Sequence, residues 1–131
     1  MWCASFSRTA MLEGIGVDIV QNSRFETLSE NTVNHILSTA ERKEAGALSG
    51  RARLEFLASR FAAKEALAKA LGTGFTRLQP RHITVVHDEM GKPCFSVSGE
   101  VADLFSSVEI HLSISHEKDY SVAMVVLDGK K

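Results

Sequence analysis

Glu65 and Lys69 are the residues whose types and spacing point most directly to chemistry. A carboxylate and an amine four residues apart lie on neighbouring turns of one helix face, and both fall in the helix-forming segment 60–74. Glu65 could bind a hard divalent cation while Lys69 contacts a phosphate. Lys64 could also contact a phosphate, or it could be a surface lysine whose stem covers apolar side chains. An ordinary surface ion pair between Glu65 and Lys69 fits the same spacing.

Asp18 is a further acidic residue, and it lies in an apolar segment. Residues 14–20 predict a short buried strand, in which an ionised carboxylate is costly unless a cation or hydrogen-bond donors compensate it. Gly14 and Gly16 would let another backbone or a ligand approach closely. Asp18 could instead cap the next helix or pair with Arg24. With Glu65, it would supply two carboxylates from separate elements, as a magnesium site often needs.

The third group is Ser113, Ser115 and His116, at the end of a predicted strand. Hydroxyls and an imidazole there suit phosphate or ribose binding. A nucleophilic triad with Asp119 or Asp18 is disfavoured, because no nucleophile elbow or oxyanion signature accompanies these residues. His116 taken alone could also be an ordinary turn histidine.

Length and composition describe one domain of ordinary globular type, with 131 residues, 44% apolar and 24% charged. The net charge of −1 gives no case for a nucleic-acid or membrane partner. Basic residues nevertheless outnumber acidic ones in the segment 42–69, which could attract an acidic partner or could simply be a solvated helix face. Cys3 and Cys94 lack metal-site spacing and indicate a reducing, cytoplasmic setting. Residues 1–12 are interpreted as an extension, frayed or added for expression, ahead of a single domain at 13–131; a short presequence is the alternative.

The pattern along the chain predicts an α+β fold, with an antiparallel sheet packed against one long helix and several short helices. Ser38 and Glu41 form a capping-box pattern that should begin a helix running to about residue 48. The expected elements are helices at 31–37, 38–48, 51–71 and 100–107, a polar helical turn in 21–30, and strands at 14–20, 83–87, 94–97, 109–115 and 120–127. The strand at 120–127 is apolar on both faces and should be central.

Three segments in this order resemble the signature of the phosphopantetheinyl transferases, in particular the short holo-[acyl-carrier-protein] synthases. They are Gly14-Ile-Gly-Val-Asp18 with Arg24 six positions on, the segment from Arg60 to Gly74, and Ser113-Ile-Ser-His116. The middle motif is the most specific, and the resemblance covers residues 14 to about 126. Asn22 departs from the family, which commonly has an aliphatic residue there.

This resemblance implies a magnesium-dependent enzyme of fatty acid biosynthesis. It would transfer 4′-phosphopantetheine from coenzyme A to a serine of an apo acyl carrier protein and release adenosine 3′,5′-bisphosphate. It also implies a homotrimer with active sites between adjacent protomers. Because the partner protein brings the attacking hydroxyl, this chain would need no nucleophile of its own.

The family's site residues transfer to matching positions of this chain. The magnesium carboxylates fall on Asp18 and Glu65, and the carrier-protein arginine falls on Arg24. The coenzyme A contacts fall at six positions, namely Lys64, Lys69, Gly91, Lys92, Pro93 and His116. Glu65 and Lys69 are the catalytic candidates, with Glu65 our hypothesis for the base that takes the serine proton. A module that binds coenzyme A without turnover and a purely structural oligomer are the alternatives from other classes.

Overall fold

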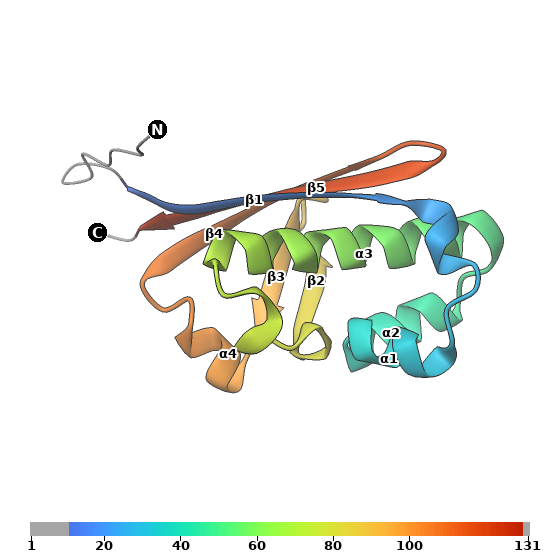
Figure 1. The fold of residues 1–131 in the computed structure, drawn as a ribbon, viewed down its shortest axis with the longest axis horizontal. Coiled ribbons are helices and arrows are strands. Elements are labelled where there is room, and N and C mark those ends of the chain that lie inside the picture. Colours follow the sequence, from blue (N-terminus) through green and yellow to red (C-terminus); the bar gives the residue numbers. More distant parts are fainter. Residues whose placement is uncertain (1–10, 130–131) are drawn as a thin grey trace.

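The structure, a computed structural model, describes residues 11–129 and contains the α+β arrangement that the sequence predicts (Figure 1). Five strands and four α-helices occur in the order β1 (Leu12–Gln21), α1 (Glu30–Ile36), α2 (Thr39–Gly46), α3 (Gly50–Leu71), β2 (Ile83–His87), β3 (Pro93–Val97), α4 (Gly99–Asp103), β4 (Val108–His116) and β5 (Tyr120–Gly129). Three short 3₁₀ turns, at Asn22–Phe25, Gly74–Thr76 and Pro80–His82, complete the described part of the chain. None of its helices is long and apolar enough to cross a membrane.

The main sheet is antiparallel with the strand order β1-β5-β4, while β2 and β3 form a separate hairpin. The prediction that the last strand is central is therefore confirmed. Its register places Ala123 of β5 between Asp18 of β1 and Ile114 of β4. Since side chains alternate along a strand, Asp18 lies on the face of the sheet that α3 covers.

Helix α3 packs directly against β1 because both elements have small residues at their contact. A Cβ atom built on Gly14 would collide with the carbonyl oxygen of Ala70, and one on Gly16 would collide with that of Ala66. The close approach expected at these glycines is thus made by the α3 backbone. It brings Asp18, two residues beyond Gly16, against the charged flank of the helix.

The expectation that β1 is a buried strand is wrong for one of its faces. Ile15, Val17 and Ile19 point away from α3 and are 65%, 57% and 63% exposed. β1 is an edge strand, and no described helix covers the outer face of its sheet (Figure 1). Apolar residues on both faces of a strand predict burial on both sides, but they do not show whether the same chain packs against the second face.

The helix ends follow their capping signals. Ser38 and Glu41 make both hydrogen bonds of the predicted capping box at α2. Gly72 ends α3 in the left-handed conformation, with φ of 85°. The polar turn expected within 21–30 is the 3₁₀ segment at Asn22–Phe25. The prediction for residues 1–12 falls largely outside the described residues, but Leu12 already belongs to β1.

Candidate active site

Asp18 and Lys69 join β1 to α3 through a direct ion pair. Lys69 donates from Nζ to Asp18 Oδ1 over 3.0 Å and to the Val17 carbonyl oxygen over 3.1 Å. Among the described residues, Lys69 forms no ion pair with Glu65, and Asp18 forms none with Arg24. The structure therefore replaces both local alternatives, the surface pair within the helix and the pair with Arg24, by a contact between distant segments.

Glu65 lies near Asp18 and Lys69, and the charges of both residues act on its pKa. The pKa of Glu65 is raised, chiefly by burial and then by the negative charge of Asp18, while Lys69 and Arg24 oppose the shift. The effect of the Asp18 charge on Glu65 places the two carboxylates in the same part of the structure. The structure thus brings together Asp18, Glu65 and Lys69.

This arrangement fits a hard divalent cation. Asp18 Oδ2 is buried and has no hydrogen-bond partner among the described residues, although Oδ1 is bound by Lys69. A buried carboxylate oxygen without a donor is costly, and a cation would compensate it. Oxygen ligands from two carboxylates, with ligand phosphates and water completing the shell, are the set that Mg²⁺ prefers.

Arg24 lies at the same end of α3, on the 3₁₀ turn that follows β1. Its guanidinium carbon is 5.9 Å from the centre of the Phe61 ring, and its charge acts on Glu65. The contact with the Phe61 ring therefore holds the positive charge of Arg24 near Glu65.

His116 and the turn that carries Gly91 and Pro93, all predicted coenzyme A contacts, line a second feature, a hollow of about 360 Å³ between α3, the β2–β3 hairpin and the end of β4. Gly91 and Pro93 belong to its lining. Lys92 is placed by its backbone N–H, which donates to Asp88 Oδ1 over 2.9 Å. Ser113 and Ser115 are exposed on strand β4, and the register places them opposite Met124 and Val122 of β5.

Arg60 also lines this hollow, and the sequence reasoning did not assign it a role. Its guanidinium stacks on Phe56 with 4.0 Å between the carbon and the ring centre, and its Nε is buried without a partner among the described residues. Burial lowers the pKa of Arg60, while Glu41 and Glu44 oppose the shift. An arginine four residues after an aromatic residue in a helix was the available signal. The positively charged Arg60 is therefore suited to bind an anion.

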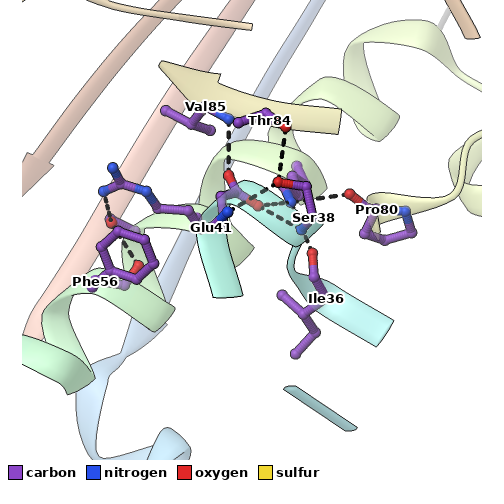
Figure 2. A network of polar contacts seen from close by, with 10 residues as sticks. Ile36, Ser38, Glu41, Phe56, Pro80, Thr84 and Val85 are labelled. Atoms are coloured by element: carbon purple, nitrogen blue, oxygen red, sulfur yellow. Dashed lines mark hydrogen bonds and ion pairs between the residues drawn. The ribbon is translucent and has the colours of Figure 1, made fainter. Parts of the chain in front are cut away.

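Lys64 does not fit the predicted phosphate contact. Its ammonium is 1% exposed and donates to Glu41 Oε1, the Ile36 carbonyl and the Pro80 carbonyl over 2.5, 2.8 and 3.0 Å (Figure 2). Burial lowers the pKa of Lys64, and Glu41 opposes that shift. Because an ammonium has three donors, all of its hydrogen-bonding capacity is used inside the protein.

Glu41, the partner of this lysine, is itself fixed by two backbone N–H groups. Glu41 Oε2 accepts the Val85 N–H over 2.8 Å, and Oε1 also accepts the Ser38 N–H over 2.9 Å. The pair therefore ties α2, α3 and β2 together, as Figure 2 shows. Lys64 is therefore a structural residue of the core and not a ligand contact.

The candidate residues form two groups on different sides of α3. Five residues at 3.6 per turn place Glu65 about 140° around the helix from Arg60. Asp18, Glu65 and Lys69 form the carboxylate group, whereas Arg60 and His116 belong to the hollow. None of the carboxylate group is among the residues that line that hollow.

A further cluster of possible ligands lies at the other end of the sheet. Glu109, His111 and Asp128 place one ligand atom each within 4.8 Å of one another. His111 Nε2 is 3.7 Å from Asp128 Oδ2 and 4.0 Å from Glu109 Oε2. Glu109 and Asp128 are direct cross-strand partners, so a charged His111 would relieve their repulsion.

Comparisons with known proteins agree on one family. A sequence model of the 4′-phosphopantetheinyl transferase superfamily matches residues 14–125. The holo-[acyl-carrier-protein] synthase of Oceanobacillus iheyensis is 39% identical over 124 residues, which cover 92% of this chain and 100% of that protein. The one from Geobacillus kaustophilus is 45% identical over 122 residues, or 90% of each chain.

A solved structure agrees in fold as well as in sequence. The crystal structure of a holo-(acyl-carrier-protein) synthase from Bacillus anthracis, in complex with CoA (3′,5′-ADP), has a TM-score of 0.81 and 41% identity, covering 92% of this chain and 100% of that one. The sequence match over nearly the whole length and the shared fold make this chain a member of the 4′-phosphopantetheinyl transferase superfamily, within its holo-[acyl-carrier-protein] synthase group.

Proposed function

We propose that this chain transfers 4′-phosphopantetheine from coenzyme A to a serine of an apo acyl carrier protein, with adenosine 3′,5′-bisphosphate as the second product. Its relatives carry the name of that activity, and the one from Bacillus anthracis was solved with CoA (3′,5′-ADP). The observation that carries the proposal for this chain is the buried Asp18 oxygen near Glu65, which has no hydrogen-bond partner within residues 11–129.

Asp18 and Glu65 are the residues that would hold Mg²⁺. When bound, the ion would neutralise the pyrophosphate and polarise the phosphorus that the serine attacks. Lys69 already lies at the Asp18 carboxylate and would place a second positive charge beside the same phosphates. Glu65 is our candidate for the base that accepts the serine proton.

The phosphate groups that do not contact Mg²⁺ and the adenine of coenzyme A would lie in the hollow. Arg60 and His116 would contact phosphate oxygens, and Gly91, Lys92 and Pro93 would lie near the adenine. Arg24 would meet an acidic surface of the carrier protein, close to the carboxylates where its serine must arrive.

The two groups on opposite sides of α3 support a site shared between protomers. We propose a homotrimer in which the carboxylate group of one protomer faces the hollow of the next. The outer face of the β1-β5-β4 sheet supports the proposal, because it exposes Ile15, Val17, Ile19 and Met124 as one apolar surface.

Mass spectrometry of an apo acyl carrier protein tests the activity. After incubation with the chain, Mg²⁺ and coenzyme A, the carrier protein should gain the mass of one phosphopantetheine group. Asp18→Ala and Glu65→Ala should abolish the gain, whereas Asp103→Asn, which removes an exposed carboxylate elsewhere, should not. Binding of coenzyme A without any mass gain would instead indicate a binding module.

Subunit mixing tests the shared site. Asp18→Ala and His116→Ala remove different halves of the proposed site, so each variant alone should be inactive. Mixed trimers would contain some interfaces with both wild-type halves, and activity should return when the two are refolded together. A site complete within one chain would give no such recovery.

A further inference from the structure

Glu55 is a carboxylate in a hollow whose other charged residues suit an anion. Arg60 and His116 line the same space. A negative charge there would be expected to repel a phosphate.

The two oxygens of Glu55 are directed at two different nitrogen groups. Oε2 is 3.8 Å from His116 Nδ1, and Oε1 is 3.4 Å from Arg51 Nε, one helical turn earlier. Of the described residues, Glu55 provides the single carboxylate within 4.0 Å of the His116 ring. Its side chain is 26% exposed, compared with 61% for Arg51 and 51% for His116. Arg51 thus pairs with one oxygen of Glu55, and the other oxygen faces the imidazole.

We propose that Glu55 is a positioning residue for His116. Its Oε2, 3.8 Å from Nδ1, would limit the rotation of a ring at the exposed end of β4 and would leave the second nitrogen, Nε2, to face the hollow. His116 would otherwise lose conformational freedom on binding an anion. The assignment of coenzyme A as that anion rests on the proposed function, whereas the contact between the two side chains does not.

The sign of one binding measurement separates this role from simple repulsion. Calorimetry with coenzyme A in Mg²⁺ buffer would compare wild type with Glu55→Ala and Glu55→Gln. If Glu55 positions His116, Glu55→Ala weakens binding by about 3- to 10-fold, the worth of one ordinary polar contact. Glu55→Gln keeps the shape and an acceptor oxygen, so it should recover part of the loss. If Glu55 only repels the ligand, both variants bind more tightly.

A double-mutant cycle shows whether the effect passes through His116. In a His116→Ala background, Glu55→Ala should change the affinity less than about 2-fold. In steady-state assays the loss should raise KM for coenzyme A and leave kcat near wild type, since Glu55 is not in the carboxylate group. Glu117→Gln is the matched control, because it removes an exposed carboxylate next to His116 that makes no ion pair with the ring among the described residues.

Unchanged or tighter binding by Glu55→Ala, or an equal loss with and without His116, overturns the positioning role. If wild type itself fails to bind coenzyme A, the proposed function fails instead. In that case, the NMR line widths and nitrogen shifts of the His116 ring, compared between wild type and Glu55→Ala, still test the contact: an unchanged ring signal overturns it.

Discussion

Lys64 of α3 and Glu41 of α2 form an ion pair with no access to solvent. The Nζ–Oε1 distance is 2.5 Å, and the two residues are 1% and 0% exposed. Every donor of Lys64 and both oxygens of Glu41 have partners within the chain. Lys69, five residues later, has a side chain that is 53% exposed and contacts Asp18. Two lysines of one motif therefore have different tasks.

Replacing each lysine by methionine should separate those tasks. Lys64→Met leaves a buried carboxylate without its cation and should lower the free energy of unfolding by about 3–5 kcal/mol. Lys69→Met removes a pair whose lysine side chain is 53% exposed, and it should lower that free energy less, by about 1 kcal/mol, while transfer activity is lost. Urea denaturation and the carrier-protein assay measure the two effects.

The kinetics of Lys64→Met provide the contradicting outcome. At a temperature where the variant is folded, its KM for coenzyme A should stay near wild type. A rise of tenfold or more in a folded variant would return Lys64 to the phosphate site. Lys64→Arg is expected to be destabilised too, because a guanidinium is larger than the space that the three acceptors enclose.

Gly16 should be intolerant of a side chain because β1 and α3 touch there through their backbones. In Gly16→Ala the new methyl group collides with the Ala66 carbonyl, so the strand must move away from the helix. We expect a loss of about 1–3 kcal/mol in stability and weaker Mg²⁺ binding, since Asp18 moves away from Glu65. Gly46→Ala is the matched control: a Cβ there meets no atom within 4 Å. Equal Mg²⁺ affinity in Gly16→Ala and wild type, by calorimetry, would contradict the link.

The sequence predicts those parts of the fold that depend on local pattern. The capping box at Ser38 and Glu41 depends on a few neighbouring residues, and it is confirmed. The left-handed Gly72 that ends α3 is a local feature of the same kind. The central place of β5 follows from its two apolar faces. β1 shows the limit, because apolar residues on its outer face indicate burial but not whether this chain provides the cover.

The site is less predictable because its contacts join distant segments. Spacing alone could not distinguish a Lys69 pair with Glu65 from the observed pair with Asp18, 51 residues away. Lys64 and Lys69 read alike in sequence; they differ in their rotation around α3 and in which elements pack over that side. The contact of Glu55 with His116 likewise depends on how α3 crosses the end of β4.

Titration of Glu65 should reveal its acidic neighbour. Burial and the charge of Asp18 raise the pKa of Glu65, so in metal-free protein its carboxyl should titrate at a higher pH than an ordinary glutamate. Asp18→Asn removes a negative charge and should lower that pKa, whereas Lys69→Met removes a positive charge and should raise it. Carbon-13 NMR of the carboxyl resonance follows both shifts.

Mg²⁺ binding should follow the same titration. Protons and the cation compete for Glu65, so affinity should fall as the pH drops through its raised pKa, at a higher pH than an ordinary glutamate would give. Calorimetry across the acidic range measures this. An affinity that does not fall as the pH drops through the titration of Glu65, followed by NMR, would show that Glu65 is not a ligand.

Ionic strength should act mainly on the encounter with the carrier protein. Carrier proteins of this type are expected to be acidic, and Arg24 and the basic residues of segment 42–69 would attract them. Salt screens the attraction between exposed charges: at 0.1 M, charges separated by more than about 10 Å hardly interact. The KM for the carrier protein should therefore rise with salt while kcat changes little.

Arg24→Gln should raise that KM at low salt and flatten its salt dependence. Arg77→Gln, which removes an exposed arginine from the turn after α3, is the control and should retain the wild-type slope. If the KM for the carrier protein is independent of salt in wild type, docking does not depend on these charges, and the role of Arg24 as a partner contact is lost with it.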